Sequence, residues 1–174
     1  RLDGNDQAQD WAVSTGKKAG DIAKEALVSA GFEIVKAPAI CRDLGIQFPF
    51  TVTDRAAGRL WYVEVAGAFT TARPGMRRAD VLWRTLGRAH VLASGHTGLD
   101  PLERPRLLIL TPRLPRPSSE GDRALRAVGG TGFFDAVELF EPTDVDRLVH
   151  YANQPGDRPL PGFWTEDEIA FRFQ

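Results

Sequence analysis

The sequence predicts an α/β fold in which helices cover both faces of a mixed β-sheet. Segments with the apolar spacing of helices alternate with short runs that are rich in β-branched and aromatic residues. Two of these runs flank a short turn at 54–58 and therefore predict a β-hairpin. A continuous apolar run at 107–110 is typical of a strand that is buried between two helical layers.

The first half of the chain is predicted to form a helix followed by three strands. The segment 17–32 places alanine, isoleucine and leucine at helical spacing, and Gly31 is a good helix stop. The turn DRAAG, with Asp54 first and Gly58 last, joins the second strand to the third. The three strands are expected at 32–40, 46–54 and 59–67.

The second half is predicted to alternate helices with strands. Its first helix has Leu82, Leu86 and Ala89 on one face. Its second helix has serine at the start and glycine at the end, and Thr143 is the expected N-cap of the third. In order, the elements are a helix at 75–94, a strand at 104–112, a helix at 118–130, a strand at 133–140 and a helix at 141–152.

These elements divide the chain into three parts. A polar N-terminal segment covers 1–16, the α/β domain covers 17–153, and the C-terminal tail at 154–174 is expected to pack on the domain or on a partner. No apolar run reaches the roughly 20 residues that span a bilayer, so we expect no membrane association. The single cysteine, Cys41, excludes an internal disulfide and favours a cytoplasmic location.

Charge is informative through its distribution rather than its total. The net charge is −1, which by itself does not predict a nucleic-acid partner. Most of the 22 basic residues are arginine, a side chain that binds phosphate in a planar, bidentate manner. One group of arginines lies close together in the sequence, namely Arg73, Arg77, Arg78, Arg84 and Arg88.

Three of these arginines are predicted to share one face of the long helix. At about 100° per residue, Arg77, Arg84 and Arg88 project within about 40° of one another, opposite the apolar face. They form either a stripe that follows DNA phosphates or an ordinary solvated face. Trp83 is expected to be a core or sheet-face aromatic, like Trp61 and Tyr62, rather than a platform on which bases stack.

The hairpin predicts which side chains meet at its end. The turn places Glu64 opposite Pro49, and Ala66 opposite Gln47. Because side chains alternate along strands, these four residues are expected on one face. The sequence therefore predicts that Gln47 and Glu64 point to the same face of the sheet.

The order of helix, strand, hairpin with an acidic second strand, helix and strand resembles the PD-(D/E)xK nuclease superfamily over roughly 17–111. The resemblance implies a restriction-endonuclease-like fold. It also implies an Asp on the first hairpin strand and a (D/E)-x-K on the second, which bind Mg²⁺ and activate water. Here VEVAGAF supplies Glu64 at the acidic position and Ala66 at the lysine position, while Pro49 stands where the Asp is expected. The run GAFTTARPGMRRADVLW at 67–83 resembles bacterial nuclease-like proteins that also carry a small residue at the lysine position.

The resemblance assigns candidate roles to four polar residues. Glu64 is the expected Mg²⁺ ligand, with Asp43 or Glu25 as the second acid and Gln47 orienting the water. Three of the four have a simpler interpretation: Glu64 as a strand residue that faces water or an arginine, Glu25 as a surface glutamate, and Gln47 as an ordinary polar strand residue.

Two functions follow from these assignments. The first is a DNA-binding, Mg²⁺-dependent deoxyribonuclease with a rearranged active site. The second is a catalytically inactive nuclease-like domain that serves a larger protein as a DNA- or protein-interaction module, either as a homodimer or with a partner protein. A purely structural module is a third interpretation. Proline and alanine at two signature positions favour the second on chemical grounds.

Overall fold

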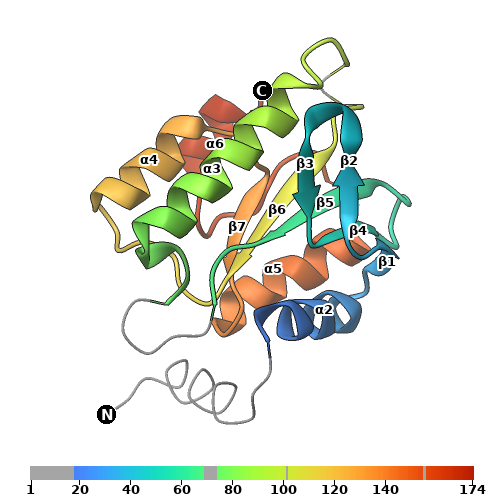
Figure 1. The fold of residues 1–174 in the computed structure, drawn as a ribbon, viewed down its shortest axis with the longest axis horizontal. Coiled ribbons are helices and arrows are strands. Elements are labelled where there is room, and N and C mark those ends of the chain that lie inside the picture. The colour runs from blue at the N-terminus through green and yellow to red at the C-terminus, as the bar shows by residue number, and fades with distance from the viewer. Residues whose placement is uncertain (1–17, 69–73, 101, 155) are drawn as a thin grey trace.

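The computed structural model describes residues 18–68, 74–100, 102–154 and 156–174 (Figure 1). Its centre is a five-stranded sheet in the order β1-β4-β5-β6-β7. The pairs β1–β4 and β4–β5 are antiparallel, and β5–β6 and β6–β7 are parallel, so the expected mixed sheet is confirmed. The strands are Glu33–Lys36 (β1), Phe50–Thr53 (β4), Leu60–Val65 (β5), Arg106–Thr111 (β6) and Asp135–Glu138 (β7).

Helices cover both faces of this sheet, as the sequence predicts (Figure 1). On one face, α2 (Ala19–Ala30) and α5 (Pro142–Asn153) pack on Val63 and Leu108. On the other face, α3 (Ala79–Ser94), α4 (Glu120–Val128) and α6 (Glu166–Arg172) pack on Leu107 and Ile109. Within the described residues, no helix is both long enough and apolar enough to cross a lipid bilayer.

The helix ends follow local sequence chemistry, with one exception. Gly31 ends α2 in the left-handed conformation with φ of 112°, and the side chain of Ser119 caps α4 by accepting a hydrogen bond from the Asp122 N–H. The expectation that Thr143 caps α5 is wrong. Pro142 lies in the first turn of α5, where a backbone N–H has no acceptor within the helix, so the N–H that proline lacks is not needed. Glu141 is therefore the N-cap residue.

Two of the predicted strands are each divided in two. Residues 32–40 form β1 and β2 (Ala39–Cys41), and residues 46–54 form β3 (Ile46–Phe48) and β4. β2 and β3 pair with each other in a separate two-stranded sheet, which packs through Phe48 on the α3 side of the main sheet. Pro49 separates β3 from β4, because proline has no N–H to donate to a ladder.

The hairpin itself has the predicted register. Phe50 pairs with Val63 and Thr53 pairs with Leu60 across β4 and β5. The buried carboxylate of Asp54 fixes the turn, because it accepts hydrogen bonds from the Ala57 N–H at 2.7 Å and from Nε1 of Trp61 at 2.8 Å. The register therefore holds up to Phe50 and ends where Pro49 begins.

The C-terminal residues contribute to the main core. The indole of Trp164 is buried, stacks on Phe133 with ring centroids 5.1 Å apart, and donates from Nε1 to the Phe134 carbonyl at 2.9 Å. The next residue, Thr165, starts α6 with a capping box. Residues 156–174 thus form part of the same folded body.

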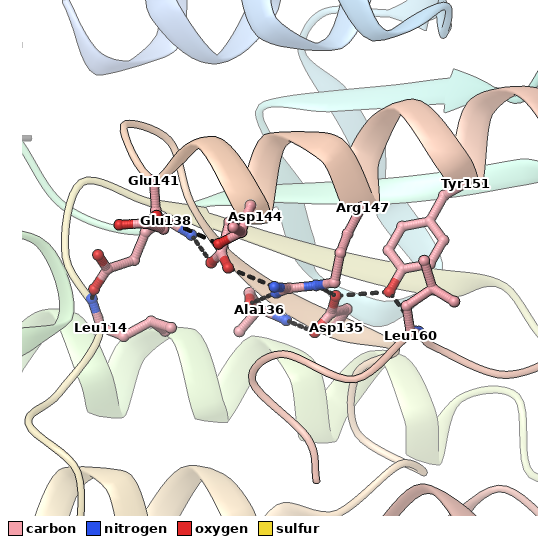
Figure 2. Close-up of polar contacts among 10 residues, drawn as sticks. Leu114, Asp135, Ala136, Glu138, Glu141, Asp144, Arg147, Tyr151 and Leu160 are labelled. Carbon is pink, nitrogen blue, oxygen red and sulfur yellow. Dashed lines mark hydrogen bonds and ion pairs between the residues drawn. The ribbon is translucent and has the colours of Figure 1, made fainter. Parts of the chain in front are cut away.

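A buried polar network connects β7, α5 and the segment after α5 (Figure 2). Arg147 donates from Nε to Asp135 at 2.9 Å and from Nη2 to the Ala136 carbonyl at 3.0 Å, and its Nη1 contacts Asp144. The Tyr151 hydroxyl donates to Asp135 at 2.8 Å and accepts from the Leu160 N–H at 2.9 Å. Burial raises the pKa of Asp135 to about 6, although Arg147 opposes the shift.

The raised pKa of Asp135 predicts a pH-dependent stability. An unfolded aspartate has a pKa near ~3.9, so the folded state binds more protons than the unfolded state between about pH 4 and 6. The free energy of unfolding contributed by this group should therefore fall by roughly 2–3 kcal/mol as the pH rises through that window. Urea unfolding of the wild type and of Asp135→Asn from pH 4 to 8 measures this as a pH-dependent difference between the two proteins. A difference that is flat, or that grows with pH, would contradict the raised pKa.

Candidate functional site

Glu64 lies near the end of β5 with its carboxylate buried against α3. Its side chain is 3% exposed, whereas that of Arg88 on α3 is 34% exposed. Nη1 of Arg88 donates to both carboxylate oxygens, at 2.8 Å and 3.1 Å, and the Val65 N–H also donates to the carboxylate at 3.1 Å. Burial raises the pKa of Glu64, and the Arg88 hydrogen bond and charge oppose that shift. The carboxylate is therefore balanced by a fixed guanidinium.

Two glycines fix the position of α3 relative to the carboxyl ends of β5 and β6. A Cβ atom on Gly67 would lie 2.5 Å from the Gly75 Cα, and one on Gly75 would lie 2.4 Å from the Thr111 hydroxyl. Gly75 has φ of 58°, which glycine adopts without strain, and it opens the 3₁₀ turn η2 (Gly75–Arg77) that leads into α3. This close approach of the backbone fixes the start of α3 against the ends of β5 and β6.

The structure separates the other expected site acids from Glu64. Glu25 lies on α2, on the opposite face of the sheet. Asp43 is exposed in the 3₁₀ turn η1 (Arg42–Leu44), and the neighbouring Leu44 packs against Gly95, about two helical turns beyond Arg88. Neither acid therefore stands beside Glu64.

The expectation that Gln47 shares the Glu64 face of the main sheet is wrong. Gln47 lies on β3, pairs with Ile40, and is exposed. The physical reason is Pro49, which takes the chain out of the main sheet before Gln47 can pair with β5. Ala66 does lie on the α3 side with Glu64, and it is buried in the core there.

This arrangement does not fit Mg²⁺. The ion replaces its water only when several anionic oxygens converge on it, whereas the one carboxylate here is already bound by an arginine. Within the part of the chain that the structure describes, no three His, Cys, Asp or Glu side chains are grouped so as to hold a metal ion. The chemistry of the site is that of a neutralised ion pair.

The predicted arginine stripe is only partly formed. Arg73 lies outside the described residues. Arg77 precedes α3 in η2, where its Nε donates to the Leu114 carbonyl at 3.3 Å, so the helical phase assumed for it does not apply. Arg88 turns inward to Glu64. The predicted stripe therefore loses Arg77 at its N-terminal end and Arg88 at its C-terminal end.

Arg78 and Arg84 remain at the surface and share one acid. Arg78 donates from Nε and Nη2 to Asp80, both at 3.1 Å, and Arg84 lies 3.8 Å from the same carboxylate. The hydrogen bond from Arg78 holds the pKa of Asp80 below its usual range. Surface ion pairs of this kind are weak, so Asp80 contributes little to holding the two arginines in place.

Trp83 is exposed, which makes the expectation of a core position wrong. Its residue surface is 62% accessible, whereas Trp61 is buried in the core as expected. At about 100° per residue, position 83 lies about 60° from Leu86 and about 100° from Leu82, at the border of the apolar face, so helical periodicity alone did not decide its exposure.

A groove lies beside Trp83, between the N-terminal parts of α3 and α4. Its volume is about 520 Å³, and it is lined by both apolar and charged side chains. Met76, Leu82 and Pro115 provide apolar walls. The charged lining residues are Arg77, Arg116 and Glu120.

Comparisons of the chain with protein-family models, with curated proteins and with solved structures find no match. The basis for a function is therefore the geometry around Glu64 and α3, together with the resemblance in the sequence. Arg88 of the ion pair and Trp83 of the groove both lie on α3.

The buried ion pair predicts unequal effects for its two members. Arg88→Ala leaves a buried carboxylate without its cation and should lower the free energy of unfolding by about 2–3 kcal/mol. Glu64→Gln removes the buried charge and should cost about 1 kcal/mol. Arg84→Ala, one turn earlier on α3, is the matched control and should have almost no effect, because its ion pair is exposed. Denaturant unfolding of the three variants measures the order, and equal losses for Arg88→Ala and Arg84→Ala would contradict it.

Proposed function

We propose that this chain is a catalytically inactive, restriction-endonuclease-like domain that binds DNA. The observation that carries the proposal is the contact between Glu64 and Arg88. Both carboxylate oxygens of the one residue that matches the acidic signature position are bound by a guanidinium. A carboxylate in that state is a poor metal ligand, because the arginine both occupies and neutralises it.

The position of Glu64 supports the nuclease-like interpretation of the fold. Glu64 lies just past the last antiparallel pair between β4 and β5, which is Phe50 with Val63. Beyond this pair the chain before β4 departs at Pro49, while β5 continues in parallel pairing with β6. The order of a helix, antiparallel strands, a helix and a parallel strand also agrees with the resemblance.

The surface of α3 supports DNA as the partner. Arg77 and Arg78 directly precede α3 and Arg84 lies on it, and the side chains of Arg78 and Arg84 are 46% and 61% exposed. Arginine releases a surface carboxylate readily and binds phosphate with paired N–H groups. A phosphate can therefore take the place of Asp80 at these side chains.

The arginine surface predicts a salt-dependent affinity. The triple variant Arg77→Ala/Arg78→Ala/Arg84→Ala should bind duplex DNA more weakly than the wild type does, whatever the DNA sequence. The slope of log K against log salt should fall by about 0.9 for each phosphate that the variant no longer neutralises. Fluorescence anisotropy with a labelled duplex, across a salt series, measures both quantities.

A matched control removes the same charge from the other side of the sheet. Lys24→Ala/Lys36→Ala/Arg55→Ala deletes three exposed cations on α2, β1 and the hairpin turn. It should leave the slope close to that of the wild type. Equal losses in both triple variants would reduce the interaction to bulk charge. Failure of the wild type to bind either duplex or single-stranded DNA would overturn DNA as the partner.

Cleavage separates the two functions that the sequence left open. Supercoiled plasmid incubated with the protein and Mg²⁺ or Mn²⁺ should remain intact. Cleavage by the wild type that disappears in Glu64→Ala would overturn the inactive assignment, and it would favour a metal-dependent deoxyribonuclease with a rearranged site.

A further inference from the structure

We infer that the groove beside Trp83 binds an unpaired nucleobase, so that single-stranded DNA is the preferred ligand of the α3 surface. This inference rests on the proposed DNA binding and adds the class of nucleic acid. The exposed indole is the feature that requires an explanation. Trp61 and Trp164 are buried in the two cores, whereas Trp83 leaves most of its surface in water.

An exposed indole next to a groove provides a stacking platform. Every base has a flat π-face, so stacking on an aromatic side chain is favourable for any sequence. Met76, Leu82 and Pro115 line the same groove as Trp83 and give it an apolar part. The groove has a volume of about 520 Å³, within the range of small-molecule pockets, so there is room for a base beside the indole.

The charges around Trp83 suit the phosphates on either side of such a base. Arg77 and Arg116 line the groove against one acid, Glu120. Arg84 follows Trp83 directly on α3 and is exposed. Arginine is therefore present both in the groove and next to Trp83 on the helix, which favours a polyanion over an apolar peptide.

A duplex cannot use the groove in the same way. Its bases are stacked on one another, so it presents phosphates to the arginines but no free π-face to Trp83. The indole therefore discriminates between the two forms, while the arginines serve both. This difference separates the present inference from the proposed function.

The test compares single strands with duplexes in one set of variants. Binding of a labelled oligothymidine and of a duplex of equal length is measured by fluorescence anisotropy for the wild type, Trp83→Phe and Trp83→Ala. Trp83→Ala should weaken oligothymidine binding by roughly tenfold, since loss of one stacked base has about that effect. Trp83→Phe should retain most of the affinity, and duplex binding should not change in either variant.

A second aromatic provides the control. Phe171→Ala removes another exposed ring, on α6, and should leave both affinities unchanged. Fluorescence gives an independent measurement once Trp11, which lies outside the described residues, is replaced by Phe. In that background oligothymidine should quench tryptophan fluorescence, and Trp83→Phe should abolish the quenching, because Trp61 and Trp164 are buried. Thermal unfolding of the Trp83 variants should match that of the wild type, because an exposed side chain contributes little packing.

The outcomes distinguish this inference from the proposed function. Duplex binding with no effect of Trp83→Ala on oligothymidine, or with equal losses for both ligands, would overturn base stacking and leave DNA binding in place. Failure of the wild type to bind either ligand would overturn both proposals. A selective loss for oligothymidine, with Phe171→Ala unchanged, would support the inference.

Discussion

A negative charge buried between a sheet and a helix needs a positive partner, and the pairing of Glu64 with Arg88 meets this need. The pair joins β5 to α3 at the point where the antiparallel and parallel halves of the sheet meet. With Arg88 directed inward and Leu82 and Leu86 packed on the core, Trp83 and Arg84 project outward. The same contact thus neutralises the candidate site and orients the surface beside it.

Most of the fold could be predicted from the sequence, because its signals are local. Glycine at the end of α2 and serine at the start of α4 have the chemistry that those positions require. The Asp54 turn set the β4–β5 register for the same reason. The register failed beyond Phe50 because a hairpin was extended through Pro49, which cannot pair in a central strand.

The candidate site was harder to predict, because it depends on contacts between distant segments. Glu64 was recognised, and an arginine partner was one of its open interpretations, but Arg88 lies 24 residues away on another element. No local pattern identifies such a pair. The prediction for Arg77 failed for a local reason. It treated Arg77 as part of the helix, whereas a short 3₁₀ turn precedes the start of α3 at Ala79. Trp83 was assigned by residue type, because its helical position at the border of the apolar face did not distinguish core from surface.

The burial of Trp164 has a consequence for the smallest unit that can fold. Its indole reaches into the core between Phe133 and Phe163, and the Tyr151 hydroxyl anchors Leu160 in the approach to it. A truncation after residue 160 would remove the Trp164 indole from the core and leave the carbonyl of Phe134 without its hydrogen-bond donor. The folding unit therefore extends through α6 and does not end with α5.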